Sequence, residues 1–379
     1  MKKILFRKLL TDCLKFFAIS IIGASAIIWV FQAVNYLDIM VEDGRNFHTY
    51  FTYTLLTFPK IISKILPFII FLSFYFVITR YEQNNELIIF WNFGVKKIEL
   101  INFFLKFSII LTIFQILLTS IAVPKTLEIG RSLIKTSEVN FIDNFIKPKK
   151  FNDIIKDLTI YSENKDKDGN FTNIYLKKKL GPNEFEVTFA KKGTIKKKGN
   201  VEILSLSNGE NLSFKNEKIT NISFQESNFN LKRLKTNTTT YIKVQENSIF
   251  DLFSCYNNLI KNDLPKIKNS KLTNCSFENL INIFREFYKR LIIPFFIPVL
   301  ILIASYLIIS SKENLDYFKK RIYIFLFGMF MIIFSETSLR FIVDNFLENI
   351  KIVLLPFIIL ISLYSIIFLK LSNSQKIKI

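Results

Sequence analysis

Six apolar segments dominate this sequence, and they fall into two groups of three near its two ends. About 20 apolar residues in a helix suffice to cross the ~30 Å hydrocarbon core of a bilayer. The predicted spans cover residues 16–34, 66–79 with an extension back through 55–65, 101–123, 291–309, 322–343 and 352–369. The sequence therefore predicts an α-helical membrane protein with three helices before and three helices after a middle region.

The middle region alternates apolar and polar residues with a period of two, which is typical of β-strands with one buried face. Turn signals such as Asp168-Gly169 and Asn208-Gly209 separate the alternating stretches. These stretches are Leu158–Ser162, Phe171–Leu176, Phe185–Phe189 and Val201–Leu206. Short antiparallel strands at this spacing favour an all-β sandwich or jelly roll. We predict an N-terminal membrane half over residues 1–124, an inserted jelly-roll domain with a C-terminal helical linker over 125–275, and a C-terminal membrane half over 276–379.

The distribution of positive charge predicts the orientation of the chain in the membrane. The net charge is +20, with 51 Lys and Arg against 31 Asp and Glu, but no basic run accompanies a nucleic-acid-binding motif. Lysine and arginine gather at one set of span ends: Lys2, Lys3, Arg7, Lys8, Arg80, Lys96, Lys97, Lys312, Lys319, Lys320, Arg321, Lys370, Lys376 and Lys378. Because cytoplasmic loops carry such an excess, we expect both termini in the cytoplasm and the β domain outside it, with no nucleic-acid partner.

Few residues of the kinds used in catalysis or metal binding form a recognisable pattern. The chain has one histidine, His48, and three cysteines, and it lacks a P-loop, an H-E-x-x-H and a G-x-S-x-G motif. We therefore expect no enzyme activity, no metal and no cofactor in this chain. Cys255 and Cys275 form a disulfide if their region lies outside the cytoplasm, or remain two unpaired small residues.

The stretch between the second and third spans, residues 80–99, is the most informative for function. Leu87, Ile88 and Trp91 fall on one face at helical spacing, and Glu82 and Glu86 lie one turn apart. Gly94 is placed to end this helix as a C-cap. A short helix between two spans either docks in a groove of a cytoplasmic partner or rests on the lipid surface.

Two further pairs of charged residues lie near the outer ends of the spans. Lys60 and Lys64 are four residues apart on one helical face, so they either form a rim of cations that binds an anionic group or extend to the membrane interface. Glu336 and Arg340 have the spacing of an ion pair on the fifth span. That pair either neutralises itself or contributes to a gate or cavity.

Several strings in this order resemble the LptF/LptG family of lipopolysaccharide export permeases. They include the proline-bearing second span, Glu86-Leu87 followed by Gly94, and the three-plus-three layout with an inserted β domain. The strings that resemble the LptF branch are Gln32–Gly44, Leu66-Pro67-Phe68, Leu158–Ser162 with Asp168-Gly169, and Phe189–Ile195. The resemblance covers nearly the whole chain.

The resemblance implies a permease subunit that takes lipopolysaccharide from the bacterial inner membrane and passes it through its periplasmic β domain. It implies an LptG-like permease as the paired subunit, an LptB-like cytoplasmic ATPase dimer, and an LptC/LptA-like periplasmic bridge. The helix bearing Glu86 would be the coupling helix that contacts the ATPase. The alternatives are the LptG role in the same complex, a membrane-anchored envelope scaffold without transport, and a polytopic membrane enzyme.

Overall fold

The computed structural model describes residues 2–37, 47–136, 148–155, 158–166, 170–181, 184–198, 201–215, 218–230, 243–260, 275–343 and 346–376. Most of Gln32–Gly44 and the predicted Asp168-Gly169 turn therefore lie outside the described residues. Contacts divide the chain into two compact units. The helical unit comprises residues 1–31, 56–128 and 242–379, and the β unit comprises 32–55 and 129–241.

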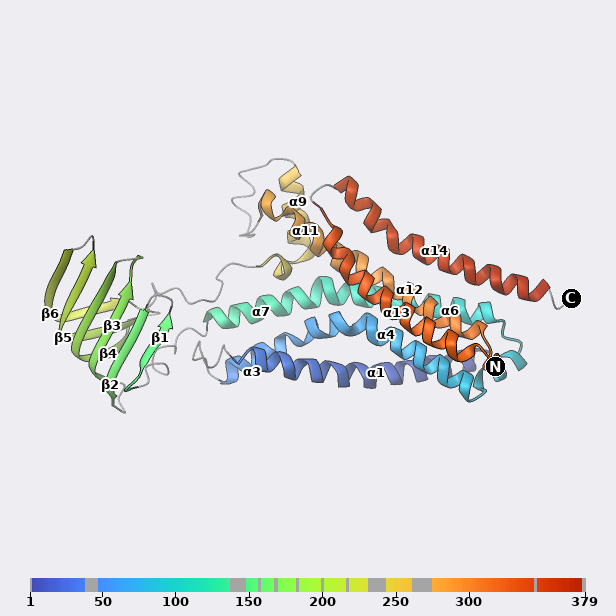
Figure 1. The fold of residues 1–379 in the computed structure, drawn as a ribbon, viewed down its shortest axis with the longest axis horizontal. Coiled ribbons are helices and arrows are strands. Elements are labelled where there is room, and N and C mark those ends of the chain that lie inside the picture. The colour runs from blue at the N-terminus through green and yellow to red at the C-terminus, as the bar shows by residue number, and fades with distance from the viewer. Residues whose placement is uncertain are drawn as a thin grey trace. The chain divides into compact units, whose positions relative to one another are not determined.

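The predicted membrane helices are present in the described part of the chain, where six helical segments are long and apolar enough to cross a bilayer. In the N-terminal half the elements are α1 (Lys2–Asn35), α3 (Phe47–Leu56), α4 (Phe58–Gln83), α5 (Glu86–Asn92), α6 (Lys97–Leu117), the π-helix η1 (Leu118–Ala122) and α7 (Val123–Thr136). Figure 1 shows α4, α6 and α12 of the helical unit running side by side. The polytopic layout predicted from hydropathy is confirmed.

The C-terminal half begins with short elements and ends with long helices. Its elements are η4 (Val244–Glu246), α9 (Ile249–Ile260), η5 (Phe277–Asn279), α11 (Leu280–Phe287), the π-helix η6 (Tyr288–Ile292), η7 (Ile293–Phe295), α12 (Phe296–Ser305), η8 (Tyr306–Ile309), α13 (Tyr317–Thr337), η9 (Ser338–Phe341) and α14 (Phe346–Lys376). All ten residues of α12 are buried, and this helix contacts α4, α6, α13 and α14. The core of the helical unit is therefore built around α12.

The prolines of the membrane helices have different effects. Pro59 lies in the first turn of α4, where its missing N–H costs nothing, and Pro67 is accommodated inside the same helix. The third span was predicted to end at residue 123, immediately before Pro124, but the helix continues from Lys97 to Ile134. The five-residue π-helix η1 precedes Pro124, which then occupies the first turn of α7.

The β unit contains six strands that pair only with their sequence neighbours in the described sheet. The strands are β1 (Phe151–Ile155), β2 (Leu158–Lys165), β3 (Asn170–Lys179), β4 (Phe185–Lys198), β5 (Val201–Lys215) and β6 (Lys218–Asn230), in the order β1-β2-β3-β4-β5-β6. The inserted β domain is thus present. Its described strands form one antiparallel meander, whereas a two-sheet jelly roll has Greek-key crossings.

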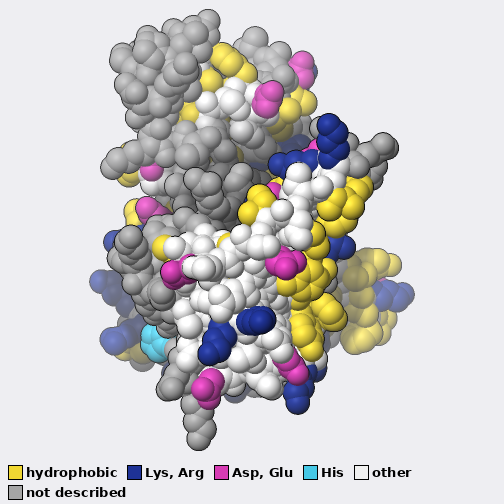
Figure 2. Space-filling view, turned by 90° about the vertical axis from the view of Figure 1, so that its left-hand side faces the viewer, with side chains coloured by type: hydrophobic (Ala, Val, Ile, Leu, Met, Phe, Trp, Pro, Cys, Tyr) yellow, Lys and Arg dark blue, Asp and Glu magenta, His cyan; other side chains and the backbone are white. Residues whose placement is uncertain are grey.

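The two faces of this sheet differ, as the alternating sequence requires. One face holds a buried core that includes Ile160, Phe171, Ile174 and Leu204. On the other face, four aromatic rings form a row: the Phe151 centroid lies 4.8 Å from Tyr161 and 5.9 Å from Tyr175, and Tyr175 lies 5.2 Å from Phe189. Ile219 and Ile222 of β6 are also exposed. Figure 2 shows a band of hydrophobic side chains on the face that it presents.

A disulfide joins Cys255 of α9 to Cys275, which precedes η5. Both cysteines are buried in a small apolar cluster with Leu252, Leu259 and Ile283. The bond and this cluster fix α9 against α11, so the pairing that the sequence left open is present in the structure.

Candidate functional site

The segment proposed for coupling is a short helix held between α4 and α6. The second span continues to Gln83, and Asn85 then adopts a left-handed conformation with φ of 62° immediately before α5. Gly94 follows α5 with φ of 70°, a conformation that favours glycine because it has no Cβ. Its N–H donates to the carbonyl of Trp91 over 2.9 Å. The predicted stretch 80–99 therefore consists of the end of one span, a seven-residue helix and the start of the next span.

The apolar side chains of α5 divide between the core and the surface. Leu87 and Phe90 are buried in the core of the helical unit, and Trp91 packs against it. Ile88 and Ile89 are 47% and 46% exposed, and Phe93 is 44% exposed. Ile88 therefore does not share the buried face of Leu87, and the exposed group at this turn is Ile88, Ile89 and Phe93.

The two glutamates of this segment make local contacts. The Glu82 carboxylate accepts a hydrogen bond from the backbone N–H of Lys312 over 2.8 Å, which ties the loop before α13 to the end of α4. Glu86 accepts from the side-chain amide of Asn84 over 3.2 Å. Glu82 thus fixes the base of the segment, whereas Glu86 lies beside its exposed apolar group.

Lys60 and Lys64 line a small pocket between elements that are distant in the sequence. Ser63 and both lysines come from α4, Thr119 from η1, and Lys289 and Arg290 from η6. The structure therefore adds Lys289 to the two predicted lysines, and we call this site the basic pocket. Its acidic member is Glu286, which lies 3.7 Å from the Lys289 ammonium.

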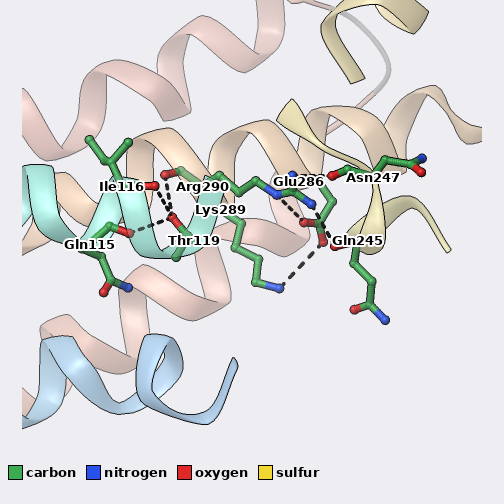
Figure 3. A network of polar contacts seen from close by, with 8 residues as sticks. All are labelled: Gln115, Ile116, Thr119, Gln245, Asn247, Glu286, Lys289 and Arg290. Atoms are coloured by element: carbon green, nitrogen blue, oxygen red, sulfur yellow. Dashed lines mark hydrogen bonds and ion pairs between the residues drawn. The ribbon is translucent and has the colours of Figure 1, made fainter. Parts of the chain in front are cut away.

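Arg290 is the centre of the polar network beside this pocket (Figure 3). Its Nε donates to the Glu286 carboxylate over 3.2 Å. Its two terminal nitrogens donate to the carbonyls of Asn247 and Gln245 over 2.8 and 2.9 Å. The side chain is only 3% exposed, and a buried guanidinium is tolerated only when it is paired and hydrogen-bonded. Arg290 therefore fixes the segment around η4 to the start of the fourth membrane helix.

The π-helices η1 and η6 meet at this network. The Thr119 hydroxyl of η1 approaches the carbonyl of Arg290 at 3.2 Å and the carbonyls of Gln115 and Ile116 at 2.9 and 3.2 Å (Figure 3). A π-helix leaves carbonyl groups without the regular α-helical partner, and such turns are frequent at functional sites. Here they bring the third and fourth membrane helices together beside the lysines.

Glu336 and Arg340 do not form the expected ion pair, although the structure describes both residues. Both side chains are exposed, and neither lines the basic pocket. The helix tightens from α13 into the 3₁₀ turn η9 at Ser338, between the two residues. This change rotates Arg340 away from the position that i,i+4 spacing on a regular α-helix would give it.

Sequence reasoning missed Lys289, Arg290 and the exposed Ile89 and Phe93. Glu286 and Arg290 have the i,i+4 spacing of a helical ion pair, so that spacing was the available signal. The contacts of Arg290 with residues more than 40 positions away had no such signal. Among the described residues, no group of three or more His, Cys, Asp or Glu side chains is placed to hold a metal ion.

Comparison with known proteins identifies the family. The profile of the family described as lipopolysaccharide export system permease LptF/LptG matches residues 7–370. A Rickettsia prowazekii (strain Madrid E) protein, described as uncharacterized protein RP871, is 25% identical over 350 residues, which cover 90% of this chain and 91% of that protein. With its six apolar helices and inserted β sheet, this multi-pass membrane protein is a transporter component and not an enzyme. The chain belongs to the LptF/LptG family of lipopolysaccharide export system permeases.

Proposed function

We propose that this chain is the LptF-type permease subunit of an ATP-binding-cassette lipopolysaccharide exporter in the bacterial inner membrane. It pairs with an LptG-like permease and takes its energy from an LptB-like ATPase dimer. The observation that carries this proposal is the exposure of Ile88, Ile89 and Phe93 on a helix whose other face is anchored in the core. An apolar group on a short, firmly anchored helix suits docking in a groove of a partner protein.

Two independent features support an orientation with both termini in the cytoplasm. The short loops at the α5 end carry the excess of Lys and Arg, which marks the cytoplasmic side. The disulfide between Cys255 and Cys275 comes before α12 in the chain, so it lies at the end of the fourth membrane helix that is opposite to the α5 end. Because disulfides persist in oxidising compartments, both features support cytoplasmic termini and a periplasmic β unit.

The basic pocket is the candidate contact for the substrate's phosphates. Lys60, Lys64 and Lys289 line the same small pocket, where one anionic group would meet their ammonium groups. Arg290 is committed to backbone carbonyls and to Glu286, so its role is to position Lys289 and η6. Glu336 and Arg340, with exposed side chains outside this pocket, remain candidates for a lateral gate.

The β unit would pass lipopolysaccharide to an LptC/LptA-like periplasmic bridge. β6 is paired on one side only in the described sheet, and it exposes Ile219 and Ile222. An unpaired strand edge can add a strand from a partner protein. The exposed aromatic row from Phe151 to Phe189 offers an apolar path across four strands. The LptG role remains the closest alternative, and the LptF-like strings of the sequence support the choice made here.

Co-purification with the ATPase tests the proposal. The full chain is expressed with its paired permease and candidate ATPases, and the ATPase retained after purification is measured. We expect the wild type to retain an ATPase dimer. The double variant Ile88→Asp, Ile89→Asp should lose it, because charged side chains cannot enter an apolar groove without a large desolvation cost.

Two matched results make this experiment decisive. Glu86→Lys should weaken the association or uncouple ATP hydrolysis. Phe250→Asp, which changes a 78% exposed residue of α9 on the opposite side of the membrane, should retain the ATPase fully. If the wild type retains no ATPase, or if Phe250→Asp loses it as completely as the α5 variant, the proposal fails and the scaffold alternative is favoured.

A further inference from the structure

A second pocket lies on the other side of η6 from the basic pocket, and its walls are almost entirely apolar. It is formed by α9, α11, η6, the residue that follows η9 and the start of α14, and its volume is about 300 Å³. Tyr256 packs edge-on against Phe284 with ring centroids 5.3 Å apart. Leu291 and Val353 complete the wall toward the membrane helices. We call this site the apolar pocket.

The polar side chains of the apolar pocket are largely engaged elsewhere. The Asn349 amide donates to the carbonyl of Val343 over 2.8 Å and accepts from its N–H over 3.0 Å. The Tyr288 hydroxyl shares a hydrogen bond with Ser338 over 2.9 Å. Tyr256 lines the pocket with its ring, and no lysine or arginine is among the lining residues. The site therefore suits a ligand that is a hydrocarbon where it contacts the wall.

The apolar pocket continues into an exposed apolar surface of α14. Ile350 and Val353 line the pocket at the start of α14, and Leu354, Ile358 and Ile361 follow on the same helix with exposures of 48%, 62% and 65%. This helix is one of the membrane-spanning segments. A hydrocarbon chain in the bilayer beside α14 can therefore enter the pocket without crossing water.

We propose that the apolar pocket binds one acyl chain of a bilayer glycerophospholipid. Its volume is at the lower end of the ~300–1,000 Å³ typical of ligand sites, and a helix about 10 Å across would not fit. Lipopolysaccharide carries several acyl chains and phosphates, and the cations that would suit it lie in the basic pocket. The bound acyl chain fills the gap between the disulfide-linked α9–α11 corner and the start of α14. Its binding therefore stabilises the contact between these two parts of the protein.

Lipid photo-labelling tests this proposal on the full chain with its paired permease in nanodiscs. The probe is phosphatidylethanolamine with a diazirine in one acyl chain, and labelled peptides are identified by mass spectrometry. We expect labelling of the Phe253, Tyr256 and Ile350 peptides to exceed that at the lipid-facing residues Ile358 and Ile361. Val353→Trp, which fills the pocket, should lose this excess, and Leu354→Trp, its exposed neighbour, should keep it.

Three outcomes would overturn the proposal. The first is equal labelling of pocket and lipid-facing residues in the wild type, a comparison that holds even if Val353→Trp fails to fold. The second is an unchanged excess in a Val353→Trp protein that still forms the Cys255–Cys275 disulfide and elutes as the wild type. The third is stronger labelling by a diazirine lipopolysaccharide probe in competition with phosphatidylethanolamine, which would assign the pocket to the exported substrate.

Discussion

The first and fourth membrane helices are both strongly apolar, but the first is almost entirely exposed and the fourth is mostly buried inside the protein. The most apolar windows of Lys2–Asn35 and Phe277–Ile309 have mean hydropathies of 2.1 and 2.7, yet 6% of the first window and 78% of the second are buried. Both helices are long enough to cross a bilayer. In a bilayer, an apolar side chain is as favourably placed against lipid as against a neighbouring helix. Hydropathy therefore identifies a span but does not tell a central helix from a peripheral one.

The largest effect is expected at Arg290, compared with the exposed Arg340. Arg290→Ala leaves the half-buried Glu286 with Lys289 as its remaining ion-pair partner, at 3.7 Å, and leaves two carbonyls without their donors; losing one partner of a buried ion pair costs about 3–5 kcal/mol. Thermal unfolding of the purified complex in detergent measures this loss. Arg340→Ala should unfold within about 0.5 kcal/mol of the wild type. Equal destabilisation by the two variants would show that the Arg290 network does not stabilise the fold.

A smaller effect is expected at Gly328 of α13, compared with Gly23 of α1. A methyl group added at Gly328 would overlap the ring of the fully buried Phe71, whereas no heavy atom lies within 4 Å of one added at Gly23. Overpacking of this kind typically costs about 1–3 kcal/mol. The melting temperature should therefore fall for Gly328→Ala and not for Gly23→Ala.

The same assay provides an internal check on the close approach of α13 and α4. Phe71→Leu should recover part of the loss when combined with Gly328→Ala, because a smaller side chain makes room for the methyl group. If the two changes destabilise additively, the two helices do not approach each other as closely as the structure has them.

The smallest effect is expected from the lysines of the basic pocket. Each lysine near an anionic lipid surface contributes about 1 kcal/mol, so replacing Lys60 or Lys64 singly by glutamine should weaken lipopolysaccharide capture by about fivefold. Lipopolysaccharide retained by the purified complex is the measurement. Lys125→Gln is the matched control, because this exposed lysine lies between Val123 and Leu127 but does not line the pocket. If the Lys125 variant loses as much lipopolysaccharide as the pocket variants, the pocket lysines act only through the general attraction between positive charge and the membrane.

Local patterns predicted much of the fold. The six apolar segments, the alternating strands and the turn at Gly94 each depend on interactions over a few residues. The described Glu336 and Arg340 form no ion pair, and the helix of the third predicted span continues past residue 123, because neither segment keeps regular α-helix geometry. A 3₁₀ turn changes the spacing in the first case, and a π-helix keeps the chain helical in the second. Neither departure has a reliable signature in a single sequence.

The sequence by itself determined the membrane class of this protein, its three-plus-three division and the position of its β insertion, because hydropathy and alternation are local and additive. Only the tertiary structure decided which helix is central, that Lys289 joins Lys60 and Lys64, and that Arg290 binds carbonyls near η4. It also decided that Cys255 pairs with Cys275. These contacts join residues far apart in the chain, and they form only where packing brings two surfaces together.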